Sequence, residues 1–222
     1  MRLTKKHYPH YLVLPLLAAG MLFASAVHAG AQIYQPLSAS VRSVLHRSIA
    51  DQAVPEVTYA SREEEQLWAQ DMPRRLEKYL PDREHRTDFL RTVYYEAKRA
   101  GLDPLMVLGL IEVESGFRKY AVSSASARGY MQVMPFWVKE IGSNEQNLFH
   151  LRTNLRYGCT ILRYYLDVEK GDLYRAFGRY NGSLGKPEYP NMVQASWRKY
   201  RNTMPKTNAA IGPSPQLAHS RL

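Results

Sequence analysis

A run of apolar residues at positions 104–115 limits how this chain can fold more than any other part of its sequence. Asp103 precedes the run as a helix N-cap, Pro104 suits the first helical turn, and Gly116 supplies a terminator. The run is apolar around nearly the whole circumference of a helix, so other elements have to enclose it. Strand-type alternation is scarce in the rest of the sequence. We therefore expect a mainly α domain built around this helix.

Glu114 places a carboxyl group in the last turn of this apolar helix. Burial disfavours the ionised form of the carboxyl, and the negative end of the helix dipole disfavours it too. Both effects raise the pKa toward values that suit proton donation near neutral pH. A Glu at a helix end is usually solvated, which makes the apolar surroundings the distinguishing feature. Glu114 is therefore the candidate catalytic acid.

A second carboxyl group in a comparable setting is not found in the sequence. Glu112 lies two positions away, about 200° around a helix, so its side chain and that of Glu114 point to opposite sides. The downstream acids stand in neither an apolar nor a glycine-bounded setting: Glu140, Glu145, Asp167, Glu169, Asp172 and Glu188. Hydrolytic glycosidases usually need a pair of carboxyl groups at the scissile bond. The pattern disfavours such a two-carboxylate hydrolase.

Metal and cofactor chemistry find no support in the sequence. His85 and His150 are isolated, and no His-x-x-x-His pair or carboxylate cluster is present. Neither a Gly-x-Ser-x-Gly elbow nor a glycine-rich phosphate loop occurs, so we expect no metal and no bound cofactor. Cys159, the only cysteine, lies on an apolar helical stripe with Leu155 and Leu162, which predicts a buried core thiol rather than a nucleophile.

The N-terminus has the pattern of a secretory signal peptide. Basic residues within positions 2–6 precede an apolar run at 11–26, which is followed by a small–x–small pattern at 27–29. The apolar run is short for a membrane span and contains Pro15 and Gly20. We therefore expect cleavage after position 29 rather than an uncleaved anchor. The mature protein is then expected in the periplasm, without stable membrane insertion.

The charge of the chain narrows the choice of partners. The formal net charge is +10, and loss of Arg2, Lys5 and Lys6 with the signal peptide lowers it to +7. Such an excess suits anionic material, either nucleic acid or the polymers of a cell envelope. Export argues against nucleic acid and favours envelope material, with a merely solvated basic surface as the alternative. No protein partner is evident from the sequence.

The chain divides into a main helical domain and flanking segments. The expected parts are a signal peptide at 1–29, a leader with an accessory helix at 30–81, the main domain at 82–201, and a disordered tail at 202–222. The leader lacks a helical period up to about residue 60 and is expected to be flexible. Ser61 opens a charged helix that is disturbed at Pro73, and we interpret this helix as solvated.

Within the main domain we expect five helical segments besides the apolar run. They are a helix ending at Gly101, a short one from Pro135 to Gly142, one at 153–169, a short segment around 173–177, and one carrying Met192, Val193 and Trp197. Irregular loops are expected at 119–128 and at 180–183, where serine, alanine and glycine are frequent.

Several short motifs stand in one order along the main domain. They are Glu114-Ser115-Gly116-Phe117, then Ala121, Ser123, Ala127, Gly129, Met131-Gln132, Met134-Pro135, Asn154 with Gly158, and Tyr180-Asn181. In order and spacing this set resembles the SLT domain of the lytic transglycosylase family, whose members have a lysozyme-like fold. The resemblance covers about residues 82–201, and the ordered set is far more specific than any single pair of residues.

The resemblance implies roles for particular residues. Glu114 matches the family's catalytic acid and base. The matching substrate-binding residues are Ser123, Gln132, Met134, Tyr180 and Asn181. Met131 is interpreted as core. Tyr130 stands where the family usually has Leu and is expected beside the glycan groove, and Trp137 stands where a small residue or Thr is common.

The resemblance also implies a reaction. It is the non-hydrolytic cleavage of peptidoglycan strands between N-acetylmuramic acid and N-acetylglucosamine, with one Glu acting as acid and then as base, to give 1,6-anhydro ends. One carboxyl group suffices because the attacking hydroxyl belongs to the substrate. Two alternatives are a lysozyme-type hydrolase, which would need a second carboxylate, and a non-catalytic glycan-binding component of an envelope assembly, which would be expected to lack the acid.

Overall fold

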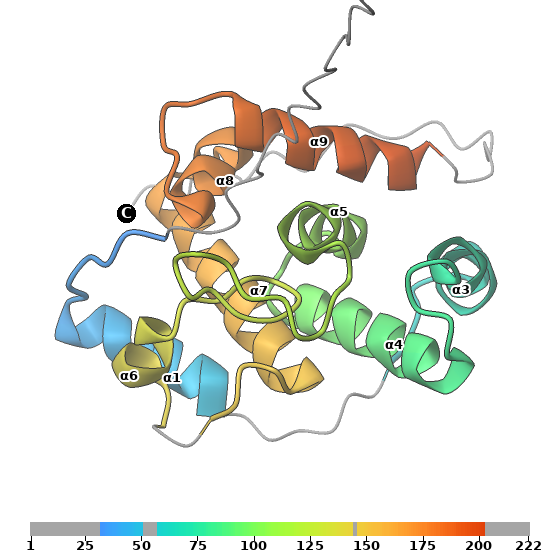
Figure 1. Ribbon diagram of the computed structural model, residues 1–222, viewed down its shortest axis with the longest axis horizontal. Coiled ribbons are helices and arrows are strands. Elements are labelled where there is room, and N and C mark those ends of the chain that lie inside the picture. The colour runs from blue at the N-terminus through green and yellow to red at the C-terminus, as the bar shows by residue number, and fades with distance from the viewer. Residues whose placement is uncertain (1–31, 51–56, 144–145, 203–222) are drawn as a thin grey trace, which may run out of the picture.

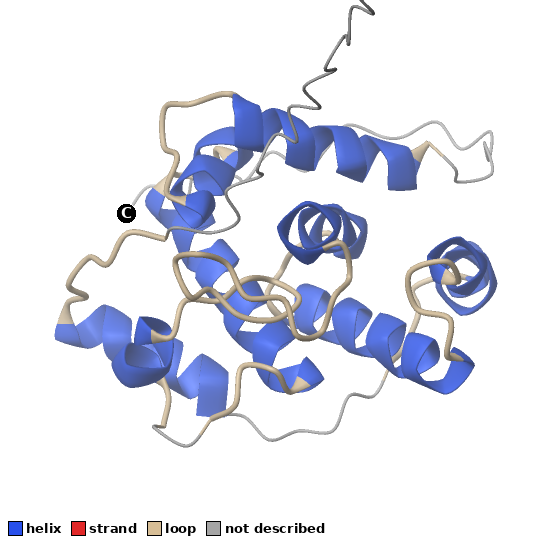
Figure 2. Cartoon of the chain, viewed as in Figure 1, coloured by secondary structure: helices blue, strands red, loops and turns tan. Residues whose placement is uncertain are grey.

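The structure is a bundle of α-helices joined by loops. This computed structural model describes residues 32–50, 57–143 and 146–202 (Figure 1). The helices are α1 (Ala39–Ala50), α2 (Arg62–Gln66), the π-helical turn η1 (Leu67–Asp71), α3 (Met72–Leu76), α4 (Arg83–Arg99), α5 (Pro104–Ser115), α6 (Phe136–Ile141), α7 (Leu151–Val168), α8 (Leu173–Asn181) and α9 (Glu188–Arg201). The described residues contain helices and loops but no strand (Figure 2), which confirms the predicted mainly α class.

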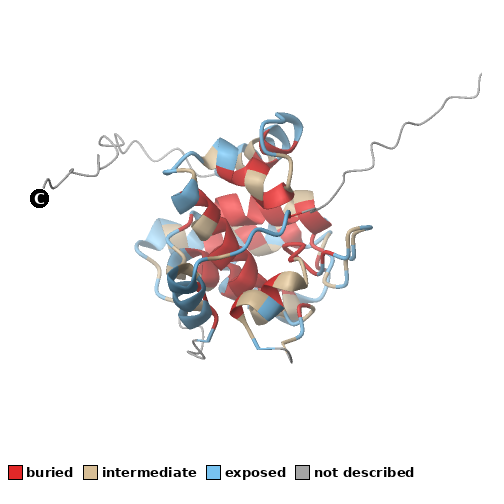
Figure 3. Ribbon diagram, turned by 90° about the vertical axis from the view of Figure 1, so that its left-hand side faces the viewer, coloured by how far each residue is buried: buried red, intermediate tan, exposed pale blue. Residues whose placement is uncertain are grey.

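Helix α5 lies at the centre, as its apolar sequence predicts. Asp103 caps it by accepting from two backbone N–H groups, and Gly116 ends it in a left-handed conformation with φ 57°. Figure 1 shows α5 almost end-on, between α9 and α4. A Cβ at Gly109 would lie 2.7 Å from the backbone nitrogen of Trp197, so only glycine permits this approach of α5 to α9. The buried residues gather in the helices at the centre of the molecule (Figure 3).

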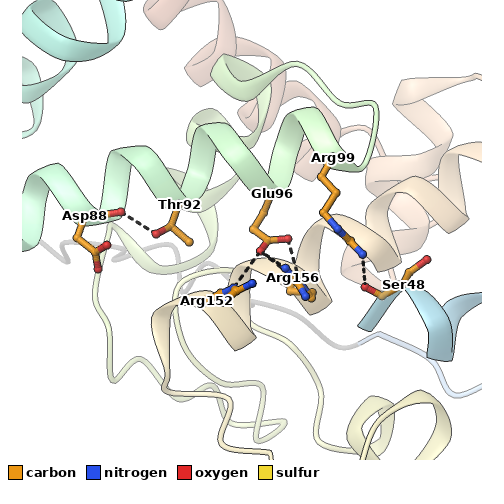
Figure 4. Close-up of polar contacts among 7 residues, drawn as sticks. All are labelled: Ser48, Asp88, Thr92, Glu96, Arg99, Arg152 and Arg156. Atoms are coloured by element: carbon orange, nitrogen blue, oxygen red, sulfur yellow. Dashed lines mark hydrogen bonds and ion pairs between the residues drawn. The ribbon is translucent and has the colours of Figure 1, made fainter. Parts of the chain in front are cut away.

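A buried ion pair joins α4 to α7. Glu96 is 1% exposed, and it accepts hydrogen bonds from Nε of Arg156 at 3.1 and 3.2 Å and from Nη2 at 2.8 Å (Figure 4). Arg152 Nε lies 3.8 Å from the same carboxylate. Cys159 is buried in α7, where burial raises the pKa of its thiol well above the usual value. The prediction of a buried core cysteine is confirmed.

The leader contains a helix that the sequence does not predict. Helix α1 packs against the main domain through Leu45 and Ile49, which are buried. His46 Nδ1 lies 3.0 Å from the carbonyl oxygen of Ile141, and Arg99 donates to the carbonyl oxygen of Ser48 at 2.7 Å (Figure 4). The expected lack of regular structure is therefore wrong for residues 39–50. The short helix gains its stability from these contacts with distant segments rather than from its own sequence.

The helix that begins after Ser61 is packed rather than solvated. Ser61 accepts from the backbone N–H of Glu64 at 3.2 Å, so the predicted N-cap is confirmed. The chain then passes through the π-helical turn η1 before Pro73, at the point where the helix is predicted to be disturbed. Its buried side chains are Leu67, Trp68, Met72 and Leu76. The interpretation as a solvated accessory helix is wrong, because this apolar stripe faces α4.

Some predictions concern residues that the structure does not describe. The signal peptide at 1–29 lies outside the described residues, as does the tail from 203 onward. Across residues 32–50, 57–143 and 146–202, no helix has the length and apolar character needed to cross a membrane.

Candidate active site

Glu114 occupies the last turn of α5 and is 3% exposed. The hydroxyl of Tyr189, in the first turn of α9, donates to Oε1 of Glu114 at 2.5 Å. The other carboxyl oxygen, Oε2, is buried and has no hydrogen-bond partner among the described residues. One oxygen is thus held by Tyr189, and none of the described residues supplies a hydrogen-bond partner for the other.

Burial controls the protonation of Glu114. Burial raises the pKa of Glu114, the hydrogen bond from Tyr189 offsets part of that rise, and the resulting pKa is about 8. The carboxyl is therefore mostly protonated at neutral pH. A buried group with such a pKa is suited to donate a proton and to take one back.

Glu112 faces away from Glu114, as the helical spacing predicts. It accepts hydrogen bonds from Tyr79 at 3.0 Å, from Ser196 at 2.5 Å, and from Lys199. Partial burial raises the pKa of Glu112, but the donated hydrogen bonds, chiefly that of Lys199, outweigh it and hold the pKa below its usual value. Glu112 is an ionised structural group that links α5 to α9, and it does not share a site with Glu114.

The loop after α5 is held by two buried amide side chains. Gln132 adopts a left-handed conformation with φ 47°, and its Nε2 donates to the carbonyl oxygens of Ala121 at 3.1 Å and Gly129 at 3.0 Å. Asn154 of α7 accepts from the N–H of Met131 at 2.8 Å and donates to the carbonyls of Arg128 and Leu148. Both amides act on loop backbone. A direct contact of Gln132 with substrate stays a prediction.

Tyr180 connects this loop to the surroundings of Glu114. Its hydroxyl donates to the carbonyl oxygen of Met131 at 2.7 Å. Burial, followed by the nearby charge of Glu114, raises the pKa of Tyr180 well above its usual value. Tyr180 and Asn181 form the last turn of α8, which ends at the left-handed C-cap Gly182, so the expected loop at 180–183 is wrong for these two residues. The role of Tyr180 toward substrate stays a prediction.

The remaining predicted substrate-binding residues have more local contacts. Ser123 is half-buried, and its Oγ accepts from the N–H of Ala127 at 3.1 Å within a turn. Asn181 donates to Oγ of Ser183 at 3.1 Å. Met134 is partly buried against the core. The structure shows where these side chains lie, and their roles toward substrate stay predictions.

Two departures from the family pattern are buried. Tyr130 is 1% exposed, and its hydroxyl lies 2.8 Å from Nε2 of His85. Trp137 is 3% exposed and donates from Nε1 to Oε1 of Gln32 at 2.8 Å. Tyr130 therefore sits in the core rather than on an open groove surface. Met131 is also core, since it packs so closely on Gly158 that a Cβ there would lie 2.3 Å from its sulfur.

Two residues, Tyr189 and Gln32, make contacts that the sequence does not predict. Tyr189 shares a helical stripe of α9 with Val193 and Tyr200, and this spacing indicates burial but not the carboxyl that its hydroxyl meets. Gln32 precedes α1 in a segment without a pattern, yet it is 3% exposed and bonded to Trp137. No local signal could identify either contact, because the partners are 75 and 105 positions away.

Metal ligation is not indicated at this site. Within residues 32–50, 57–143 and 146–202, no group of three or more His, Cys, Asp or Glu side chains is arranged to hold an ion.

An enclosed helical domain with one buried, protonatable Glu defines a candidate acid–base site. Residues 91–203 match the transglycosylase SLT domain, and the chain belongs to this family. The resemblance predicted from the ordered motifs is thereby confirmed. The matched region begins within α4 and includes Glu114, the loop after it, and Tyr189.

Individual relatives are distant or match only a short segment. Over 47 residues the chain is 53% identical to the membrane-bound lytic murein transglycosylase C of Actinobacillus pleuropneumoniae serotype 5b (strain L20), which is 21% of this chain and 13% of that protein. Over 132 residues it is 28% identical to the transglycosylase of Enterobacteria phage PRD1, which is 56% of this chain and 49% of that protein. The chain thus spans half or less of the length of these relatives.

Proposed function

We propose that this chain is an exported lytic transglycosylase that cleaves the β-1,4 bond between N-acetylmuramic acid and N-acetylglucosamine in peptidoglycan. The observation that carries the proposal is the state of Glu114, a buried carboxyl with a pKa of about 8. Membership of the SLT family supports the substrate class, and the signal-peptide pattern supports a periplasmic location.

The first chemical step is protonation of the leaving group. Oε1 of Glu114 accepts the hydroxyl hydrogen of Tyr189, so the acid proton belongs on Oε2, the oxygen without a partner. Transfer of this proton to the glycosidic oxygen accompanies cleavage of the bond between that oxygen and C1 of the muramic acid. The carboxylate that remains keeps the hydrogen bond from Tyr189, which stabilises its new charge.

The second step uses the same carboxylate as a base. It removes the proton from the C6 hydroxyl of the muramic acid while that oxygen bonds to C1, closing the 1,6-anhydro ring. Glu114 regains its proton, and no water is consumed. A nucleophile within the substrate makes a second enzyme carboxylate unnecessary, and Glu112 is already committed to Lys199 and Ser196.

The products distinguish this reaction from its alternatives. We expect the mature protein, incubated with purified peptidoglycan, to release fragments with 1,6-anhydromuramic acid ends, each lighter by one water than a hydrolysed end. Mass spectrometry of the muropeptides measures this difference. Reducing ends throughout would indicate a lysozyme-type hydrolase. Undigested peptidoglycan that still retains the protein would indicate a non-catalytic glycan-binding component.

Tyr189 is expected to tune the acid. Its hydrogen bond lowers the pKa of Glu114, so Tyr189→Phe should raise that pKa further and move the alkaline limb of the pH profile of kcat/KM upward. The carboxylate formed during reaction also loses a charge-assisted hydrogen bond, so we expect kcat to fall roughly tenfold or more. Measured rates between pH 5 and pH 9 would show both effects.

A second tyrosine on the same helix provides the control. Tyr200 is buried in α9 beside Glu112, not Glu114. Tyr200→Phe should leave the pH profile of kcat/KM in place. An unshifted profile for Tyr189→Phe, or equal shifts for both variants, would contradict the assigned role of Tyr189.

A further inference from the structure

A cluster of aromatic and basic side chains lies where the loop after α5 meets the segment just before α7. Tyr120 is 70% exposed, and its ring centroid lies 5.7 Å from that of Phe149. Lys119 Nζ is 5.2 Å from the centre of the Tyr120 ring, and the Arg128 guanidinium carbon is 5.9 Å from the centre of the Phe149 ring. We call these four residues the aromatic–cation platform.

The platform is rigidly built although it lies on a loop. The residue after Tyr120, Ala121, accepts hydrogen bonds from Nε2 of Gln132 and from the N–H of Gly129 at 2.9 Å. Arg128 is held by backbone bridges to Val122 and Val133, and Asn154 binds its carbonyl oxygen. Side chains on a fixed backbone lose less entropy when they bind a ligand.

The platform is connected to the candidate active site through a short series of contacts. Tyr180, whose pKa responds to Glu114, donates to the carbonyl oxygen of Met131. The next residue, Gln132, bonds to Ala121 beside the platform. Tyr120 is six residues from Glu114 in sequence, so their Cα atoms are no more than ~22 Å apart. A polymer with several repeating units can reach both places at once.

The charge around the platform is unbalanced. Between Ser115 and Lys139 the sequence contains Arg118, Lys119, Arg128 and Lys139 but no Asp or Glu. Lys119 and Arg128 form no ion pair with another described residue. Basic groups without acidic neighbours attract an anionic ligand, and exposed Tyr and Arg are the residues most often found at binding hot spots.

We propose that the aromatic–cation platform binds the acidic stem peptide of a peptidoglycan strand whose glycan lies at Glu114. This inference rests on the proposed function and adds a specificity to it. The sugar rings of such a strand carry neutral hydroxyl and acetamide groups, whereas the peptide on the muramic acid carries free carboxylates. Lys119 and Arg128 match those carboxylates, with the guanidinium able to bind one in two-point fashion. The ring of Tyr120 offers an apolar face to the peptide's methyl groups.

The test compares two substrates that differ only in the peptide. One is intact glycan strands, and the other is the same strands after an amidase has removed the stem peptides. We expect the wild-type protein to have the higher kcat/KM on peptide-bearing strands. The double variant Lys119→Gln/Arg128→Gln should lower the ratio of the two kcat/KM values roughly fivefold, and Tyr120→Ser should lower it as well. Raising the salt concentration should lower the wild-type ratio but not that of the double variant.

A control variant distinguishes an effect of the platform from an effect of the protein's net charge. Arg62 and Arg198 are exposed, on α2 and α9, so Arg62→Gln/Arg198→Gln removes the same charge elsewhere. This control should keep the wild-type ratio. Active wild-type protein whose ratio is unchanged in the platform variants, or lowered equally in the control, would overturn the inference. Wild-type protein that forms no anhydro ends on either substrate would overturn the proposed function instead.

Discussion

Glu114→Gln is expected to reduce formation of anhydro ends by about a thousandfold or more while leaving the fold intact. The amide has the shape of the acid and can still accept the hydrogen bond from Tyr189, but it cannot donate a proton to the glycosidic oxygen. The rate of muropeptide release and the circular dichroism spectrum are the measurements. Undiminished activity would remove Glu114 from the mechanism.

The same substitution should also change how stability depends on pH. The Glu114 carboxyl ionises near 4.5 when unfolded and near 8 when folded, so between these values the native state holds more protons. The stability of the wild-type protein therefore falls as pH rises through this window, by about 1.4 kcal/mol for each unit of pKa difference. Glu114→Gln has no ionisable group at this position, so its stability does not change with pH in this way.

Thermal unfolding can measure this difference. We expect the Tm of Glu114→Gln to exceed that of the wild-type protein near pH 8, with the gap closing as the pH approaches 4.5. Equal Tm values across the range would mean that the pKa of Glu114 is not raised in the folded protein. The activity loss and the gain in stability together would mark a group retained for chemistry rather than for folding.

Of the substitutions proposed for this protein, Arg156→Met is expected to lower the free energy of unfolding most. Glu96 would remain buried with only Arg152 nearby, at 3.8 Å from one oxygen. Removing one partner from a buried ion pair costs about 3–5 kcal/mol, because the other charge is left without compensation. In a protein of this size such a loss lowers the Tm by roughly 10 °C. Urea unfolding and calorimetry would measure it.

Two further variants show whether the lost pairing is the cause. Adding Glu96→Leu to Arg156→Met removes both charges and should restore most of the lost stability. Arg163→Gln breaks an exposed ion pair with Asp167 on the same helix and should cost less than about 1 kcal/mol. If the double variant is as unstable as Arg156→Met alone, the loss of stability comes from altered packing rather than from an unpaired charge.

The parts of the fold that sequence predicts are those specified by local pattern. Helix α5 is apolar on every side and is bounded by Asp103 and Gly116, so both its position and its burial follow from the sequence. Helix α1 has only the short apolar stripe of Val41, Leu45 and Ile49, and its contacts come from Ile141 and Arg99 far along the chain. Such contacts leave no trace in the local sequence.

The candidate site likewise has features that the sequence predicts and features that it does not. The position and raised pKa of Glu114 follow from its apolar helix, and the ordered motifs identify its neighbours. The orientation of those neighbours does not follow: Gln132 turns its amide toward loop backbone, and Tyr189 supplies a hydroxyl from a helix 75 positions away. A motif indicates which residues gather near the acid, but hydrogen-bond geometry decides which of them touch it.

The contact of Gln32 with Trp137 limits how far the chain can be shortened from its N-terminus without exposing buried side chains. The family match begins at residue 91, yet Gln32 and α1, which precede the match, pack against α6 and α7. A fragment trimmed to the family boundaries would open the indole of Trp137 and the surfaces beneath Leu45 and Ile49 to water. We therefore expect a fragment that begins at residue 91 to be less stable than one that keeps Gln32 and α1.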